Sequence, residues 1–184
     1  DEYLRHIHEL REGITERSDL NYIQDLLEKD GDETKLMYSL SNLLRMLGQC
    51  YHEEVVVLID EYDALMQEAY EGGFSNEAIR FFKTFYGTAL KGNKNVRICL
   101  LTGVFEIAKD SLSSSLNNPS VFTVLDKKFS SYFGFSEQEC EALLSYYGLE
   151  KNIEKVKEWY GGYRFGNYEV INPWSTLHYI DKQG

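Results

Sequence analysis

The sequence has few cysteines, which can form disulfides, and few prolines, which break helices and strands. It holds three cysteines (Cys50, Cys99 and Cys140) and two prolines among 184 residues. No CxxC pair occurs, which excludes a zinc ribbon and a thioredoxin-type redox motif. An odd number of cysteines without a disulfide framework predicts a reducing, cytoplasmic location. With no low-complexity run and 43% apolar residues, the chain is expected to fold around a hydrophobic core.

Long apolar runs and an excess of positive charge are also missing. No run approaches the ~20 residues that span a bilayer, so no membrane association is expected. Thirty acidic residues against 19 basic ones give a net charge of -11. Such a field repels polyphosphates at a distance, so we do not expect this chain to bind nucleic acid by itself. Because the sequence starts at Asp1 and not at Met, we interpret it as a piece of a longer protein.

The apolar pattern predicts an α/β fold. Val55 to Ile59 is a run of five aliphatic residues without alternation, which is typical of a strand buried on both faces of a parallel sheet. Val96 to Leu101 is the next strand candidate, and an amphipathic helix capped by Ser75 lies between them. Strand, helix and strand over this distance predict a βαβ unit. Val121 to Leu125 is a third, short strand candidate.

Helices are predicted on both sides of this unit. In the first 50 residues the strongest is expected over residues 34–47, with Gly48 as its C-cap. Near the C-terminus, Ser136 starts a capping box, and Asn172-Pro173 is a helix start signal. We therefore expect residues 1–126 to form a partial parallel sheet flanked by helices, and residues 127–184 to form a mainly helical, lid-like part.

Aromatic residues gather in this C-terminal part. The set includes Tyr132, Phe133, Phe135, Trp159, Tyr160, Tyr163, Phe165 and Trp174. A surface that stacks on nucleic-acid bases interleaves its aromatic residues with Lys and Arg. Acidic residues dominate here, so we expect these side chains to form a packed core.

Two adjacent carboxylates, Asp60 and Glu61, end the Val55 to Ile59 strand. Ligands of α/β sheets bind outside the carboxyl ends of the strands. Asp60 at this position can hold Mg²⁺, and Glu61 can orient or deprotonate an attacking water. An apolar strand followed by Asp-Glu is the Walker B pattern of nucleotide hydrolases. The alternative is a strand end whose two acids simply face solvent.

Four segments, in order, make the chain recognisable: VVVLIDEYDALMQEAYEGG, LLTGVFEIAKDSLSSSLNN, VFTVLDKKFSSYFGFSEQE and VKEWYGGYRFGNYEVINPWSTLHYI. Together they resemble the AAA-ATPase-like family of bacterial P-loop NTPases, over about residues 35–180. The resemblance implies ATP and Mg²⁺ as cofactors of the intact protein. Members of this family are often fused to a C-terminal nuclease-like domain with a restriction-endonuclease fold, which the resemblance implies as a further partner.

The same resemblance assigns roles to individual residues. Asp60 and Glu61 become the Walker B pair, and Asp63 an acid that supports them. Thr102, after the second strand, falls at the place of the sensor residue that bonds the γ-phosphate or the water; the alternative is a strand-end threonine before a glycine turn. Arg164, within WYGGYRFG, could reach a phosphate, or could serve as a structural partner of an acid, which is the commoner fate of a lone arginine.

A Walker A loop is absent from the sequence. No GK[ST] occurs, and the only glycine spacing that imitates it, residues 87–94, ends a helix instead of starting one. We expect the Walker A strand and loop to lie upstream of Asp1. The chain alone is then expected to bind ATP poorly, and its Val96 to Leu101 strand would be a bare edge prone to self-association.

Other departures from the family pattern keep a second hypothesis open. Leu65 stands where proline is common, Gly161 where an acid is common, and Glu106 where arginine is common. The last two favour a degenerate NTPase fold that serves as a scaffold or interaction domain without hydrolysis. Whether the chain belongs to an active ATPase is therefore left undecided by its sequence.

Overall fold

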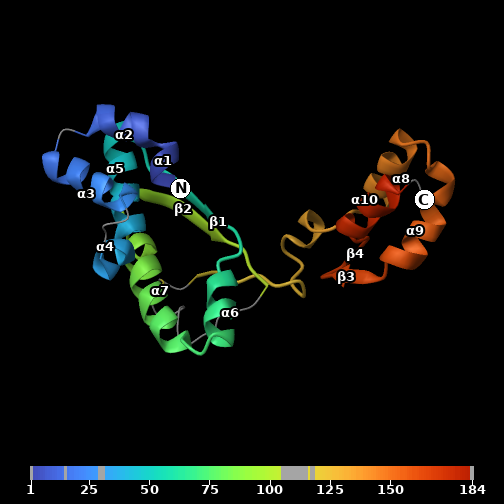
Figure 1. Cartoon of the computed structure of the whole chain (residues 1–184). Coiled ribbons are helices and arrows are strands. Elements are labelled where there is room, and N and C mark those ends of the chain that lie inside the picture. The colour runs from blue at the N-terminus through green and yellow to red at the C-terminus, as the bar shows by residue number, and fades with distance from the viewer. Residues whose placement is uncertain (1, 15, 29–31, 105–115, 117–118, 183–184) are drawn as a thin grey trace. The chain divides into compact units, whose positions relative to one another are not determined.

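The computed structural model describes residues 2–14, 16–28, 32–104, 116 and 119–182 (Figure 1). By contacts the chain divides into two units, Asp1–Pro119 and Ser120–Gly184. The first contains the predicted sheet, and the second is mainly helical. The division falls a few residues before the boundary expected at residue 126. Each unit is described by itself.

Helices make up the N-terminal half of the first unit. They are α1 (Glu2–Arg5), α2 (Ile7–Gly13), α3 (Arg17–Leu27), α4 (Glu33–Met37) and α5 (Ser39–Tyr51). Their shared core contains Leu10, Ile14, Ile23, Leu43, Met46 and Leu47. The apolar stripe that predicted a helix over residues 34–47 therefore does turn inward, as amphipathic spacing requires.

That predicted helix differs from the observed one in two ways. It is divided at Tyr38 into α4 and α5, and α5 continues to Tyr51, where His52 ends it in the left-handed conformation with φ 54°. Gly48 is consequently not a C-cap. A Cβ at Gly48 would lie 3.1 Å from Oδ1 of Asn95, so this glycine allows α5 to approach the segment that leads into the second strand.

The βαβ unit forms as predicted. Strand β1 (Val55–Ile59) pairs in parallel with β2 (Val96–Leu101). Two helices connect them, the unpredicted α6 (Ala64–Glu71) and the predicted α7 (Ser75–Leu90). Ser75 is the first residue of α7 and not its cap, because Phe74 holds the N-cap position without a side-chain bond. Helix α6 escapes sequence analysis because it spans only two turns and has no capping side chain at its start.

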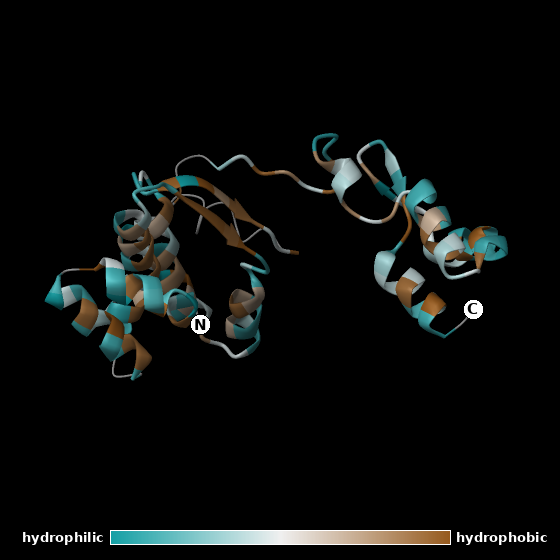
Figure 2. Ribbon diagram, turned by 90° about the horizontal axis from the view of Figure 1, so that it is seen from above, coloured by the Kyte–Doolittle hydropathy of each residue, from teal (hydrophilic) through white to brown (hydrophobic). Residues whose placement is uncertain are grey.

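Among the described residues, only one face of this sheet is covered. Val57 is buried and packs with Leu44 of α5 and Ala89 of α7. On the other face Val56 is 52% exposed and Leu58 72% exposed, and the apolar residues of β2 that point the same way are also exposed. Figure 2 shows the two strands as an apolar ribbon. The expectation of a strand buried on both faces is thus wrong for this chain alone. In the described part, β2 pairs with β1 only, which agrees with the predicted bare edge.

The second unit is a helical layer with a small hairpin. Its elements are η2 (Ser130–Tyr132), α8 (Glu137–Tyr146), η3 (Glu150–Asn152), α9 (Ile153–Tyr160), β3 (Tyr163–Phe165), β4 (Tyr168–Val170) and α10 (Pro173–Asp181). The Ser136 capping box and the Asn172 cap are both confirmed. The core contains Cys140, Leu144, Val156, Ile171, Tyr179 and Ile180.

The hairpin was not predicted, and a predicted strand is absent. Gly166 and Asn167 form a two-residue turn between β3 and β4, with Gly166 at φ 54°. A Gly-Asn pair between aromatic and β-branched residues is a known hairpin signal. The predicted strand over residues 121–125 does not form. Instead the Asp126 side chain accepts the Thr123 N–H at 2.7 Å, which closes a turn there.

The prediction that the late aromatic residues form the core is largely wrong. Tyr132, Phe133, Trp159, Tyr163 and Trp174 are exposed. Aliphatic residues and Cys140 supply most of the buried core instead, with Tyr179 as its aromatic member. Of the predicted set, Phe135 and Tyr160 are partly buried and pack against this core. Over the described residues, no helix is both long and apolar enough to cross a membrane.

Candidate functional site

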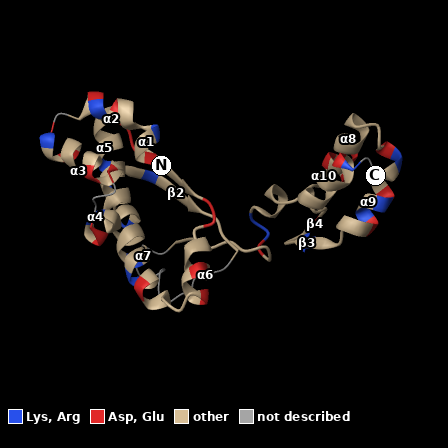
Figure 3. Ribbon diagram, in the orientation of Figure 1, with Lys and Arg blue, Asp and Glu red and all other residues tan. Residues whose placement is uncertain are grey.

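The carboxyl ends of β1 and β2 meet at one edge of the sheet because the strands are parallel. Asp60 and Glu61 follow β1, and Thr102 follows β2. Backbone bonds continue the pairing past the strands. The Thr102 N–H donates to Ile59 O at 2.9 Å, and the Tyr62 N–H donates to Thr102 O at 3.0 Å. The positions of these residues are therefore fixed by the sheet ladder itself. Figure 3 shows the acidic segment in red directly after β1.

The side chains of Asp60 and Thr102 contact each other. The Thr102 hydroxyl donates a hydrogen bond to Oδ1 of Asp60. The same oxygen accepts the backbone N–H of Glu61 at 3.0 Å. Within the described part of the chain, Oδ2 of Asp60 has no hydrogen-bond donor. The carboxylate is thus oriented through one oxygen, and no described donor engages the other.

Glu61 has an unusual backbone conformation. Its φ is 51°, in the left-handed region that residues with a side chain seldom adopt. The Ala64 N–H donates to Glu61 O at 3.0 Å, which holds this turn before α6. The Glu61 side chain is exposed, and no described residue bonds its carboxylate. Non-glycine residues with positive φ gather at functional sites, where the strain is maintained by the surroundings.

Asp63 is the buried acid of the site, with 5% of its surface exposed. It precedes α6, and its Oδ2 accepts the backbone N–H of Val104 at 3.1 Å. A Cβ on Gly103 would collide with Oδ1 of Asp63 and would lie 2.7 Å from the ring of Tyr62. Asp63 therefore ties the start of α6 to the turn after β2, and only glycine leaves room for that contact.

Sequence analysis missed two parts of this arrangement. The Val104 N–H and the close approach at Gly103 take part in holding Asp63. The sequence did indicate a glycine turn after Thr102, but it gave no signal that this turn would close on Asp63. Glu106, whose identity departs from the family pattern, lies outside the described residues.

The arrangement offers hard oxygen ligands at a strand end. Carboxylate oxygens suit Mg²⁺, which commonly takes one or two carboxylates and completes its shell with waters and substrate phosphates. In the described ranges, no group of three or more His, Cys, Asp or Glu side chains could hold a metal by itself. Asp60 fits the role of a single protein ligand, and a bound ion would need its other ligands from water and phosphate.

Arg164 lies in the second unit. It is exposed on β3 and stands opposite Glu169 of β4 in the hairpin register. Opposite charges facing each other across two strands stabilise a hairpin by a fraction of a kcal/mol, roughly 0.2–1. Within the first unit the structure brings Asp60, Glu61, Asp63 and Thr102 together, and Arg164 belongs to the second unit.

Gly161, the other departure, has a steric reason to be glycine. It follows α9 directly, and a Cβ at this position would lie 2.5 Å from the backbone oxygen of Lys157. An acidic side chain would require the end of α9 to move. The glycine is therefore explained by local geometry.

The chain is similar in sequence to known proteins. The sequence model of the family described as "Predicted AAA-ATPase" matches residues 1–113, which include both strands and the four residues at their ends, and stops before Arg164. A protein of Azotobacter chroococcum mcd 1, described as "Uncharacterized protein in vnfD 5'region", is 29% identical over 144 residues. That alignment covers 77% of this chain and 27% of the relative. No solved structure matches. The family match spans more than half of the 184 residues, so the chain belongs to the AAA-ATPase-like family.

Proposed function

We propose that the edge formed by Asp60, Glu61 and Thr102 is the magnesium and γ-phosphate side of an ATP-hydrolysing site. The observation that carries the proposal is the hydrogen bond from Thr102 to Asp60. It joins the ends of two strands that are far apart in the sequence. A nucleotide hydrolase needs this juxtaposition of a metal-binding acid and a polar group beside the terminal phosphate.

Each residue has a distinct role in the proposal. Asp60 holds Mg²⁺ through its Oδ2, directly or through a bound water. Bound Mg²⁺ neutralises charge on the phosphates. Glu61, exposed and without a described partner, accepts a proton from the attacking water or orients it. Thr102 orients Asp60, and its hydroxyl can turn toward the γ-phosphate. Asp63 is a positioning residue that acts through the turn after β2.

Phosphate binding requires more than these residues supply. P-loop proteins use several backbone N–H groups and a lysine, and each charge-assisted bond is worth about 1.5–3 kcal/mol. The 184 residues contain no GK[ST] sequence. At roughly tenfold in affinity per 1.4 kcal/mol, the chain alone should bind ATP very weakly. The loop would come from a part of the protein outside these residues.

The test compares two proteins. The 184-residue chain is titrated with Mg·ATP by calorimetry, and the longer protein that includes the preceding coding sequence is assayed for binding and turnover. We expect no micromolar binding by the short chain, but binding and hydrolysis by the long one. In the long protein Glu61→Gln should retain binding and stop turnover, because an amide cannot accept the water's proton.

A matched control is available on the same strand. Glu54 immediately precedes β1 and is exposed at the opposite end of the strand. Glu54→Gln makes the same chemical change and should leave turnover unaltered. Unchanged hydrolysis in Glu61→Gln would refute the role of Glu61. Micromolar binding by the short chain would refute the need for another segment.

The second hypothesis is a scaffold that has kept the fold without hydrolysis. Its support from Gly161 is weakened, because the contact with Lys157 explains that glycine. Absence of a GxxxxGK[ST] loop from the preceding coding sequence would favour the scaffold. If that loop is absent and the protein is a scaffold, Asp60 has no metal to hold. Asp60→Asn should then leave the affinity of the protein for its binding partner unchanged.

A further inference from the structure

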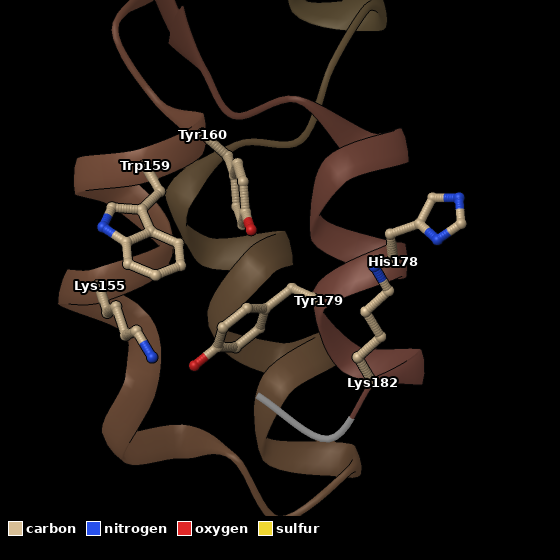
Figure 4. Close-up of a pocket in the computed structure, with 6 residues that line it drawn as sticks. All are labelled: Lys155, Trp159, Tyr160, His178, Tyr179 and Lys182. Atoms are coloured by element: carbon tan, nitrogen blue, oxygen red, sulfur yellow. The ribbon is translucent and has the colours of Figure 1, made fainter.

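A hollow of about 320 Å³ lies between α9 and α10 in the second unit. It is lined by Lys155, Trp159, Tyr160, His178, Tyr179 and Lys182 (Figure 4). Its size is at the lower end of the range for small-molecule sites, roughly 300–1,000 Å³. It involves none of the residues proposed to act on ATP.

The charge of the lining is opposite to that of the chain. Two lysines line the hollow, and no Asp or Glu does, whereas the whole chain carries a net charge of -11. Lys157, on the opposite side of α9 from Lys155, pairs with Glu137 of α8 at 2.5 Å. Lys155 and Lys182 have no ion pair with any described residue. Two uncompensated ammonium groups beside one hollow favour an anion.

Aromatic rings form the wall against which these charges lie. The Lys155 ammonium is 4.8 Å from the ring centroid of Trp159 and 5.3 Å from that of Tyr179. Tyr160 contacts both rings edge-on, with centroids 6.1 Å apart in each pair. Trp159 nevertheless remains 58% exposed. A planar group could therefore stack on the Trp159 indole.

The hydroxyl of Tyr179 is buried and has no hydrogen-bond partner. Only 6% of the residue is exposed. Buried polar groups are nearly always bonded, so an exception requires an explanation. In Figure 4 the Tyr179 ring extends from α10 toward α9, with the Lys155 ammonium beside it, while the His178 ring turns away. A shift of the flexible Lys155 side chain would give a ligand oxygen access to this donor.

We propose that the hollow between α9 and α10 binds a small aromatic anion. Its planar ring would stack on Trp159, and its phosphate or carboxylate would lie beside Lys155 and accept a hydrogen bond from the Tyr179 hydroxyl. Two sources share this chemistry, a nucleoside monophosphate and an aromatic carboxylic acid. The proposal does not depend on hydrolysis at the sheet edge.

Trp159 fluorescence in the 184-residue chain tests it. The chain has two tryptophans, so Trp174→Phe leaves Trp159 as the only reporter. We expect saturable quenching, below about 1 mM, by adenosine 5′-monophosphate, by 4-hydroxyphenylacetate, or by both; the pair distinguishes the two sources. Adenosine lacks the charge and inorganic phosphate lacks the ring, so each should bind at least tenfold more weakly than the probe that saturates.

Variants distinguish a ligand-binding site from a contact surface that only packs α9 against α10. Lys155→Met should weaken binding at least tenfold, and Lys151→Met, on the neighbouring η3 turn, should change it less than twofold. Tyr179→Phe should weaken binding several-fold without loss of stability, since the hydroxyl bonds nothing in the protein. Glu61→Gln should leave binding unchanged, which separates this site from the sheet edge.

The proposal is overturned if neither anionic probe saturates. It is equally overturned if adenosine or inorganic phosphate binds as tightly as the full ligand. Equal effects of Lys155→Met and Lys151→Met would show that general charge, and not this hollow, attracts the probe. Circular dichroism on every variant confirms that folding is retained.

Discussion

The Thr102 hydroxyl donates a hydrogen bond to the carboxylate of Asp60, across the ends of two adjacent parallel strands. Because the backbone of Thr102 also pairs with Ile59 and Tyr62 on either side of Asp60, the two side chains cannot separate without disturbing the sheet. A substitution at either residue should therefore change the position of the other side chain.

Thr102→Val is expected to keep the fold and reduce activity. Valine preserves the β-branched shape but removes the donor to Asp60. Loss of a hydrogen bond to a charged group, about 1.5–3 kcal/mol, corresponds to roughly 10–100-fold in kcat/KM of the ATP-hydrolysing protein. Thr102→Ser keeps the hydroxyl and should retain most of the activity. Equal losses in both variants would contradict a specific role of the hydroxyl.

At most positions an alanine variant is more stable than a glycine variant, and we expect the opposite order of stability at Glu61. The left-handed conformation costs a residue with a side chain about 1–2 kcal/mol, while glycine loses roughly 0.5–1 kcal/mol through its greater freedom when unfolded. Glu61→Gly should therefore be more stable than Glu61→Ala by up to about 1 kcal/mol in urea unfolding.

A matched pair at an ordinary helical position checks this reasoning. Glu68 is exposed within α6, and there alanine should be the more stable replacement by about 1 kcal/mol. If Glu61 behaves in the same way as Glu68, its positive φ is not a property of the protein in solution. Greater stability of Glu61→Gly than of Glu61→Ala would instead show that Glu61 is held in a strained turn.

The βαβ unit could be predicted from sequence because its signal is local. The bounds of β1 and β2 were predicted correctly, since continuous aliphatic runs bounded by polar residues leave little choice. The meeting of Asp60 with Thr102 also follows once the strands are known to be parallel. The Asp63 to Val104 bond could not be predicted, because it depends on a turn shape that only glycine at position 103 permits.

Burial was predicted less well than secondary structure. Aromatic residues near the C-terminus were expected inside, yet Trp159 and Trp174 are exposed while Leu144 and Val156 are completely buried. Composition alone does not say which face of a helix an aromatic residue occupies. The hairpin turn at Gly166 was missed for a different reason: each of its strands has only three residues, too short for a period of two to be visible.

Gly103→Ala should both destabilise the first unit and displace Asp63 at the candidate site. The new methyl group would collide with Asp63 and press on the Tyr62 ring, and overpacking of this kind costs about 1–3 kcal/mol. Part of that cost should disappear in an Asp63→Ala background, where the colliding oxygen is gone. Urea unfolding of the two single variants and the double variant measures the coupling. Simple additivity would contradict the contact.

Low pH should lower the unfolding free energy of the second unit, because it protonates the glutamate of the capping box. The Ser136 N–H and hydroxyl both donate to the Glu139 carboxylate at 2.8 Å, and these bonds lower the pKa of Glu139. A carboxylate whose pKa is lower in the folded state stabilises the protein above its unfolded pKa, about 4.3. That contribution is lost as the pH falls through the lower folded value. Both tryptophans lie in this unit, so their fluorescence reports its unfolding.

Glu139→Gln removes the titration while keeping an acceptor for the Ser136 N–H. The unfolding free energy of this variant should depend less on pH between about 5 and 3 than that of the parent chain, because the proton-linked term is gone. Glu141 lies on the same helix, is exposed and makes no capping bond, so Glu141→Gln serves as the control and should retain the parent's pH dependence. A Glu139→Gln curve parallel to that of the parent would show that the capping box does not contribute to acid sensitivity, and that other carboxylates must account for it.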